Sequence, residues 1–172
     1  MVERVKVIHG DITKQAVDAI VNAANSTLLG GGGVDGAIHR EAGPHLVWEC
    51  RKLGGCPTGS ARITKGYYLP AKHVIHAVGP MWQGGDRGEE ELLARTYRSV
   101  FDLAAQNGIT SVAIPAISTG AYRFPLERAA RIAVRETRSC LEGNFSLKLV
   151  LFVCFERAAY DTYVAAVAET FG

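Results

Sequence analysis

The sequence predicts an α/β fold, a three-layer α/β/α sandwich around a mixed, mostly parallel central sheet. Two observations support this prediction: apolar segments of strand length alternate along the chain with longer segments of helical period, and the loops between them are short. A chain of 172 residues, of which 48% are hydrophobic, is long enough to bury one substantial core. Because no repeat, low-complexity segment or internal boundary interrupts it, we expect a single domain over residues 1–172.

In the N-terminal half, glycine and proline mark where the periodic segments stop. The segment 19–24 is nearly all apolar, which is typical of a strand buried on both faces. A helical segment follows the glycines that begin at Gly30 and is broken at Gly43. The expected elements are a strand at 5–9, a short turn or helix at 12–17, a strand at 19–24, helices at 34–42 and 45–53, a loop at 54–59, and strands at 61–64 and 72–78.

In the C-terminal half, the helices are longer. Residues 89–107 carry apolar side chains at helical spacing, and Gly108 is a natural C-terminal stop. Pro125 predicts the first turn of another helix. The expected elements are an exposed loop at 79–88, a helix at 89–107, a strand at 111–114, a helix at 125–141, a strand at 147–155 and a helix at 158–171.

The most informative segment runs from Asn22 to Gly36. An apolar strand leads through two asparagines into four consecutive glycines, and Asp35 then lies at the start of a helix. Ordering four glycines is costly, because glycine loses more backbone freedom on folding than any other residue. Such a segment indicates main-chain N–H groups brought close to a phosphate at a helix N-terminus. A flexible surface loop is the alternative, but the flanking strand and helix argue against it.

A second loop of small residues follows the strand at 111–114 and runs from Pro115 to Pro125. It also leads into a helix. Ligands of parallel α/β sheets bind at the carboxyl ends of the strands, where such loops converge. Two amide-rich loops at two strand ends suit a diphosphate better than a single phosphate. Taken alone, the second loop is also compatible with an ordinary tight turn at Ser118-Thr119-Gly120.

Three other classes of function are disfavoured. Gly31-x-Gly33-x-x-Gly36 matches the dinucleotide-binding pattern, but a dehydrogenase needs an acidic residue at the end of the next strand, and here that strand is followed by Lys65-Gly66. No Walker pattern is present, so hydrolysis of nucleoside triphosphates is not expected. The net charge is only +2 and the basic residues are scattered, so neither nucleic acid nor a membrane is expected as a partner.

The four cysteines have neither the spacing of a disulfide framework nor that of a metal site; they are Cys50, Cys56, Cys140 and Cys154. Cys140 and Cys154 lie in apolar surroundings, where a thiol usually behaves as a small buried hydrophobe. The N-terminus has no signal-peptide pattern, and no apolar stretch approaches the length of a membrane span. We therefore expect a soluble, cytoplasmic protein that uses no metal and no cofactor.

Six segments in chain order together resemble the macrodomain family, and within it the MacroD-type ADP-ribosyl hydrolases, which include the bacterial O-acetyl-ADP-ribose deacetylases. The segments are residues 10–13, 18–25, 30–39, 55–59, 76–80 and 118–122. They run through nearly the whole chain. The resemblance implies that the ligands are ADP-ribose and its esters, and that mono-ADP-ribosylated proteins are partners.

The resemblance implies an adenine site around Asp11, which would accept a hydrogen bond from the adenine amino group, with the Ile12 amide beside it. A carboxylate only accepts hydrogen bonds and the adenine amino group donates them, so the chemistry agrees. A turn or helix cap is an equally natural role for Asp11. Phe155, just past the last strand, would stack on the adenine, with ordinary core packing as its alternative.

The resemblance also implies phosphate-binding and ribose-binding residues in the two loops. The phosphate-binding residues are Gly32, Gly33 and Val34 in the first loop and Ser118, Thr119, Gly120, Ala121 and Tyr122 in the second. Asn25 would contact the distal ribose and contribute to catalysis, and Tyr122 would pack against that ribose.

Asp35 matches the catalytic carboxylate of the family. Bound phosphates nearby would raise its pKa and make it a better base near neutral pH. Its alternative role is a simple interaction with the positive end of the helix that it begins. His39 lies at i+4 on the same helix face and could support Asp35, but we expect it to be a structural hydrogen-bonding residue.

The expected reaction is hydrolysis of an ester on the distal ribose of ADP-ribose. No serine or cysteine with a partnering base is visible, so direct attack by water near Asp35 is favoured over a covalent enzyme ester. The main alternative is a module that binds ADP-ribose without catalysis. Asn25 and Asp35 are both intact, which favours the enzyme. A phosphatase acting on ADP-ribose-1″-phosphate would share the same pocket.

Overall fold

The computed structural model describes residues 1–144 and 146–172. Its strands are β1 (Val5–His9), β2 (Ala19–Ala23), β3 (Ala61–Lys65), β4 (His73–Ala77), β5 (Ser111–Ile114) and β6 (Leu149–Cys154). Its α-helices are α1 (Gly33–Ala42), α2 (Pro44–Leu53), α3 (Glu89–Gln106), α4 (Leu126–Gly143) and α5 (Arg157–Phe171), and two short 3₁₀ helices are η1 (Val2–Arg4) and η2 (Ile12–Lys14).

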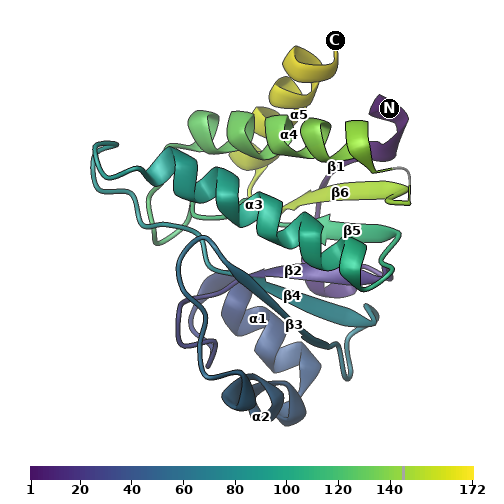
Figure 1. Ribbon diagram of the computed structural model, residues 1–172, viewed down its shortest axis with the longest axis vertical. Helices are drawn as coiled ribbons and strands as arrows, with labels where there is room; N and C mark the ends of the chain where they lie inside the picture. Colours follow the sequence, from purple (N-terminus) through teal and green to yellow (C-terminus); the bar gives the residue numbers. More distant parts are fainter. Residues whose placement is uncertain (145) are drawn as a thin grey trace.

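The six strands form one sheet in the order β1-β6-β5-β2-β4-β3 (Figure 1). Every neighbouring pair is parallel except β3 and β4, which are antiparallel. The sheet is therefore mixed and mostly parallel, which confirms the prediction. Strands far apart in the sequence become neighbours in this order, so that Asn22 of β2 lies beside His76 of β4.

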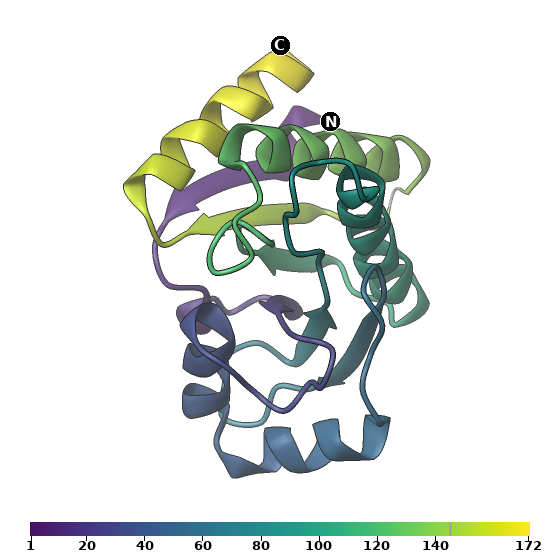
Figure 2. The same ribbon diagram turned by 90° about the vertical axis from the view of Figure 1, so that its left-hand side faces the viewer.

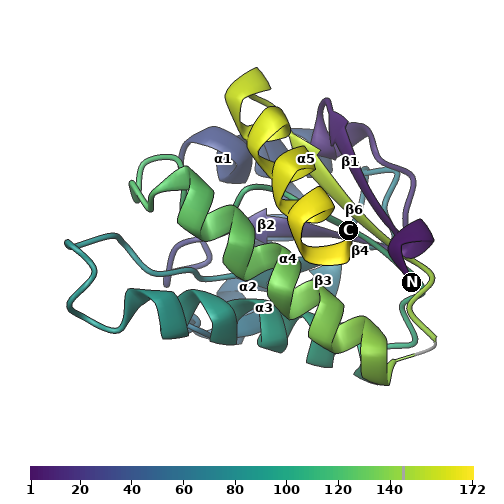
Figure 3. The same cartoon turned by 90° about the horizontal axis from the view of Figure 1, so that it is seen from above.

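Helices cover both faces of the sheet, with α3 and α4 on one side and α1 on the other (Figure 3). Along β6 the side chains alternate between two hydrophobic clusters: Val150 and Phe152 belong to the cluster that contains residues of α3, α4 and α5, whereas Leu151 and Val153 belong to the one that contains residues of α1 and α2. Residues 19–23 are nearly all apolar and mostly buried, as predicted for a strand with helices on both faces, with Asn22 as the polar exception. The three-layer sandwich is thus confirmed.

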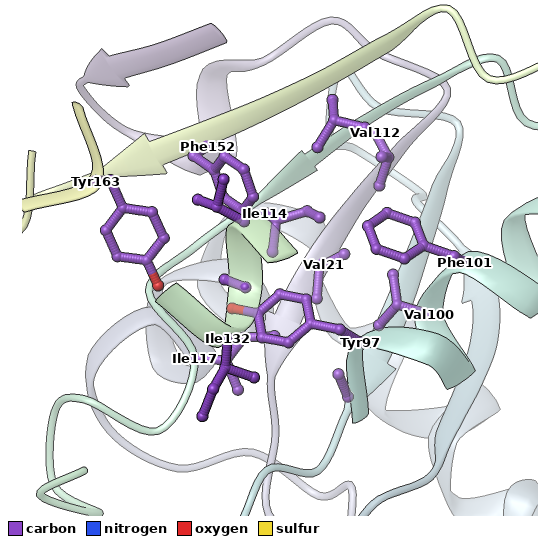
Figure 4. Packing of buried hydrophobic residues seen from close by; sticks show 14 of the residues in the cluster. Val21, Tyr97, Val100, Phe101, Val112, Ile114, Ile117, Ile132, Phe152 and Tyr163 are labelled. Carbon is purple, nitrogen blue, oxygen red and sulfur yellow. The ribbon is translucent and has the colours of Figure 1, made fainter. Parts of the chain in front are cut away.

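Aromatic side chains fill the core between the sheet and helices α3 and α5. The rings of Phe152 and Tyr163 lie 5.3 Å apart, and Tyr97 and Tyr163 are fully buried. Figure 4 shows the Tyr97 and Tyr163 hydroxyl groups pointing toward one another at the centre of this layer. Burial of a side chain such as Phe152 contributes about 1.5–3 kcal/mol to the free energy of unfolding, so this layer holds the helices firmly against the sheet.

Most predicted elements are present with bounds that shift by one or two residues, and the 3₁₀ helix η2 is three residues shorter than the segment predicted at 12–17. Pro125 is the N-cap residue of α4, which begins at Leu126, so the proline precedes the first turn of the helix. Strand β6 begins at Leu149, because the N–H groups of residues 148 and 149 both donate to the Thr110 carbonyl. The loop at 79–88 is not exposed throughout, because the Trp82 ring packs 4.8 Å from the Phe124 ring.

The loops after β2 and β5 lie at the carboxyl ends of the parallel strands, which face the viewer in Figure 2. The N-terminus of α1 begins at the same edge, directly after the glycine run. Among the residues that the structure describes, no helix has the length and apolar character needed to cross a membrane.

Candidate active site

A cavity of about 730 Å³ opens at this edge of the sheet. All the residues predicted to bind the ligand line it: Asp11, Ile12, Asn25, Gly32, Gly33, Val34, Asp35, Ser118, Thr119, Gly120, Ala121, Tyr122 and Phe155. Several further residues that were not predicted to bind the ligand also line the cavity, among them Gly31, Arg40, Glu41, Gly79, Ile117 and Glu156. The fold thus brings the adenine-side, phosphate-side and ribose-side candidates to one cavity.

The four consecutive glycines, residues 30–33, differ in whether and why the structure requires glycine at each position. Gly30 and Gly33 have φ angles of 97° and 56°, in the left-handed region that favours glycine. A Cβ atom on Gly31 would lie 3.1 Å from Asp35 Oδ2 and 3.4 Å from Asn25 Nδ2, so Gly31 lets these two side chains approach. Gly32 has neither a positive φ nor a neighbour within 4 Å of an added Cβ, so nothing in the protein itself requires glycine there.

Asn25 braces the first loop. Its Nδ2 donates to the Gly30 carbonyl at 3.0 Å, and its Oδ1 accepts from the N–H and hydroxyl of Thr27 at 3.0 and 2.5 Å. These bonds hold the Asn25 amide next to Gly31 at the cavity wall. This bracing role was not predicted from the sequence, and contact of Asn25 with the distal ribose stays a prediction.

The second loop is held from below by Gly79. A Cβ atom on Gly79 would lie 2.2 Å from Ser118 Oγ and 2.8 Å from Ile117 Cγ2, so only glycine permits this approach. Ser118 has a φ of 68°, and its buried hydroxyl has no hydrogen-bond partner within the described part of the chain. The loop is closed by the Phe124 N–H, which donates to the Ser118 carbonyl at 2.9 Å.

Two groups of unpaired main-chain N–H donors border the cavity. The first comprises Gly32 to Asp35, where a helix N-terminus leaves its N–H groups without intrahelical acceptors. The second comprises Ser118 to Tyr122, whose N–H groups have no acceptor among residues 1–144 and 146–172. Main-chain N–H groups at a helix N-terminus and in a neighbouring loop are typical anion-binding groups, so two such groups at one cavity indicate a binding site for an anion.

Acidic side chains outnumber basic ones among the residues that line the cavity. Asp11, Asp35, Glu41 and Glu156 are acidic, and Arg40 is basic. An anionic ligand would therefore depend chiefly on the main-chain N–H groups for its binding, as the modest net charge of the chain predicts.

Asp35 is the buried carboxylate of the site. It lies in the first turn of α1 and is 5% exposed. Asn22 Nδ2 donates to its Oδ1 at 2.9 Å, from within β2. Burial raises the pKa of Asp35, while the Asn22 hydrogen bond and His39 oppose the shift. A side chain of β2 therefore holds the Asp35 carboxylate in place. The alternative role of Asp35, a simple interaction with the positive end of α1, would not require this hydrogen bond.

Asn22 was missed as a site residue, although its position carried a signal. It is a fully buried amide in a strand whose other residues are apolar, and such a group needs a buried partner. That partner is Asp35, thirteen residues later in the chain.

His39 does not make the structural hydrogen bond that was expected of it. Its Nε2 has no hydrogen-bond partner among the residues described, and lies 3.4 Å from Asp35 Oδ1. An added Cβ on Gly30 would lie 3.7 Å from the His39 ring, so the first glycine of the run packs against this imidazole. His39 thus approaches Oδ1 of the carboxylate, whereas Gly31 lies next to Oδ2.

The two adenine-side candidates have different outcomes. Asp11 caps η2: its Oδ1 accepts from the N–H and hydroxyl of Thr13 at 2.9 and 2.7 Å, and these bonds lower the pKa of Asp11. The cap leaves Asp11 at the cavity wall, so the adenine role stays a prediction. The alternative that Phe155 packs in the core is wrong, because Phe155 follows β6 and is 74% exposed at the cavity rim.

The family model described as "Macro domain" matches residues 21–133 of the chain. The chain belongs to the macrodomain family. A Macro domain-containing protein of Methanosarcina mazei is 59% identical to this macrodomain over 168 residues, which cover 98% of this chain and 90% of that protein. A protein of Pantoea vagans named O-acetyl-ADP-ribose deacetylase 1 is 51% identical over 166 residues, covering 94% of this macrodomain and 97% of that protein.

Solved macrodomain structures have the same fold. The macrodomain of Trypanosoma brucei in complex with ADP-ribose aligns with a TM-score of 0.91 and 47% identity, over 95% of this chain and 69% of that one. The macrodomain of Oceanobacillus iheyensis with ADP aligns with a TM-score of 0.92 and 41% identity, over 96% of this chain and 90% of that one. The predicted family is thus confirmed by sequence and by fold.

Proposed function

We propose that this macrodomain binds ADP-ribose and hydrolyses an ester on its distal ribose. Two substrates fit this proposal: O-acetyl-ADP-ribose, and ADP-ribose attached to an Asp or Glu side chain of a protein. The observation that carries the proposal is the placement of a buried carboxylate, Asp35, between two loops of unpaired N–H groups in one cavity.

The two loops support binding of a diphosphate. Residues 32–35 and 118–122 offer N–H donors from two strand ends, which can surround adjacent phosphates. Gly32 and Gly120 have open space where a Cβ would stand, so main chain can approach a ligand closely at both positions. The complexes of the Trypanosoma brucei macrodomain with ADP and with ADP-ribose add support from related proteins.

Asp35 would orient and deprotonate the attacking water. Its Oδ1 accepts from Asn22, and its Oδ2 lies on the side of Gly31 and Asn25, at the cavity wall. Its pKa, already raised by burial, would rise further beside a bound diphosphate, which brings a carboxylate closer to an effective base at neutral pH. General-base catalysis of this kind contributes roughly 10²- to 10⁴-fold.

The protonation state of the Cys50 and Cys56 thiols argues against a covalent thioester intermediate. Burial raises the pKa of Cys50 to about 11 and also raises the pKa of Cys56, so both thiols stay protonated at neutral pH. A protonated, buried thiol is a poor nucleophile. Direct attack by water is therefore the simpler route.

The alternative is a module that binds ADP-ribose without hydrolysing it. The paired Asn22–Asp35 contact favours the enzyme, because a buried carboxylate is costly to keep where it has no chemical role. The name of the Pantoea vagans relative, O-acetyl-ADP-ribose deacetylase 1, points the same way.

Calorimetric titration with ADP-ribose, combined with product detection on O-acetyl-ADP-ribose, tests the proposal. We expect Asp35→Ala to keep ADP-ribose binding and to lose about tenfold or more of its turnover. Asp102→Ala, which removes an exposed carboxylate on α3 that does not line the cavity, is the control and should behave as the unmodified protein does. Undiminished turnover in Asp35→Ala would remove Asp35 from the reaction, and binding without any turnover would establish the non-catalytic module.

A further inference from the structure

A line of polar side chains crosses the sheet beneath Asp35, on the face otherwise packed with apolar residues of α1 and α2. Asn22, His76 and Thr64 come from the adjacent strands β2, β4 and β3, and their exposed fractions are 0%, 0% and 3%. His76 belongs to one of the segments that resemble the family, yet neither the expected reaction nor the core gives it a role. Polar groups in such a layer are costly unless each is paired.

The hydrogen bonds along this line have a determined direction. An ionised Asp35 only accepts, so the Asn22 group that lies 2.9 Å from its Oδ1 is the NH₂ group. The same nitrogen lies 3.1 Å from His76 Nδ1, which must then be the acceptor. His76 therefore carries its proton on Nε2, which lies 2.9 Å from Thr64 Oγ1. The Thr64 hydroxyl in turn donates to the Lys65 carbonyl at 3.1 Å.

The Asn22 amide depends on these contacts for its orientation. Its Oδ1 has no hydrogen-bond partner among the described residues, so only the two bonds of Nδ2 distinguish this orientation from the flipped one. If His76 carried its proton on Nδ1, that N–H would face the Asn22 NH₂ group. If the amide flipped so that its oxygen accepted from this N–H, the same oxygen would face the Asp35 carboxylate, which only accepts hydrogen bonds and would repel it.

The groups around His76 keep its ring neutral. Asp35 and His39 of α1 and Cys50 of α2 are the titratable groups on the helix side. Cys50 Sγ lies 3.7 Å from His76 Nε2, and the ring centroids of His39 and His76 lie 6.4 Å apart. Burial, with a smaller effect of His39, lowers the pKa of His76 to about 3. A neutral ring with a single N–H is what the line requires.

We propose that His76 is a positioning residue for the hydrolysis: it accepts on Nδ1, holds the NH₂ group of Asn22 toward Asp35, and so fixes which carboxylate oxygen faces the cavity. Thr64 acts one step further away by accepting the Nε2 proton that selects this tautomer. The effect on turnover rests on the proposed hydrolase function, whereas the tautomer and its effect on Asp35 do not.

The first test is the tautomer itself. Long-range ¹H–¹⁵N spectra of the uniformly labelled protein report the protonation of both ring nitrogens of each histidine, and the His76 signals are those missing in His76→Gln. We expect His76 to be neutral and protonated on Nε2 from pH 8 to pH 5, and to remain so with ADP-ribose bound. Protonation on Nδ1, or an imidazolium in this range, would overturn the proposal whether or not the protein is an enzyme.

The second test removes the selecting acceptor with little change in shape. We expect Thr64→Val to lower kcat on O-acetyl-ADP-ribose roughly three- to tenfold, the size of one hydrogen bond, with an unchanged Kd for ADP-ribose; Thr64→Ser should restore it. Thr137→Val is the matched control: Thr137 is equally buried and its hydroxyl donates to the Ala133 carbonyl, but it lies on α4, on the other face of the sheet. A general loss of stability would affect both Thr→Val variants.

A carboxyl ¹³C titration of Asp35 separates the outcomes. Since the Asn22 hydrogen bond lowers the pKa of Asp35, that pKa should rise in Thr64→Val and in Asn22→Ala, and not in Thr137→Val. If the unmodified protein has no turnover, the proposed function fails but this shift still tests the positioning. An Asp35 pKa and a kcat both unchanged in Thr64→Val would refute the role of His76.

Discussion

Gly79 and Ser118 approach so closely that a Cβ atom on Gly79 would lie 2.2 Å from the Ser118 hydroxyl oxygen. Gly79 lies two residues after the end of β4, and Ser118 lies in the loop after β5. This contact therefore joins the ends of the two strands that flank β2. It positions the second of the two loops that border the cavity.

Gly79→Ala should displace that loop and weaken ADP-ribose binding. Overpacking of this kind typically costs about 1–3 kcal/mol, and we expect the Kd to rise roughly tenfold or more. Calorimetry with ADP-ribose measures the change. Gly143→Ala, at a position with open space outside the cavity, is the control. An unaltered Kd in Gly79→Ala would show that the Ser118 loop does not bind the ligand.

Gly120→Val should separate binding from stability. Gly120 has neither a positive φ nor a neighbour within 4 Å of an added Cβ, so the folded chain can accept a side chain there. We expect a Tm close to that of the unmodified protein and a substantially weaker affinity for ADP-ribose, because the side chain would stand where main chain must approach phosphate. Gly143→Val should change neither quantity. Full affinity in Gly120→Val would move the diphosphate away from this loop.

The pH dependence of turnover should report Asp35. The base must be ionised, and burial raises the pKa of Asp35 above the ordinary value of 3.8, so kcat/KM should fall on acidification at a higher pH than an exposed aspartate would give. Asn22→Ala should move this acid limb to still higher pH, because it removes a hydrogen bond that lowers the pKa. A pH profile on O-acetyl-ADP-ribose that is the same in both proteins would contradict the assignment of Asp35 as base.

Glu89 should make the loop at 79–88 sensitive to acid. Glu89 is 2% exposed, and its carboxylate accepts from the N–H groups of Gln83, Gly85 and Arg87 at 2.6–2.9 Å. Burial alone would raise the pKa of Glu89, but these hydrogen bonds outweigh it and lower the pKa from 4.5 to about 2. A depressed pKa in the folded state contributes stability that is present above pH 4.5 and is lost as the pH falls toward 2.

Fluorescence of Trp82, measured in a Trp48→Phe background, can follow this loop because the Trp82 ring packs against Phe124. We expect an acid transition between pH 4.5 and about 2 that disappears in Glu89→Gln. Glu90→Gln changes the neighbouring exposed glutamate and should keep the transition. An identical transition in Glu89→Gln would show that another group controls the loop.

The strands and helices could be predicted because their apolar periods are local. The direction of β3 needed more: the short connection between Lys65 and His73 is typical of an antiparallel pair, since a parallel pair requires a long crossover. The loop residues of the cavity were found from glycine patterns and from the family resemblance. Asn22 and His76 were not, because their contact depends on β2 and β4 being neighbours in a sheet whose order differs from chain order.

The most direct test of the account is the ratio of kcat on O-acetyl-ADP-ribose between the unmodified protein and Asp35→Asn, which removes the charge while nearly keeping the shape. With Kd for ADP-ribose measured on the same samples, the account predicts equal or similar binding and a kcat lowered about tenfold or more. A ratio near one would contradict the role of Asp35, and an unmodified protein that binds ADP-ribose without turnover would contradict the hydrolase.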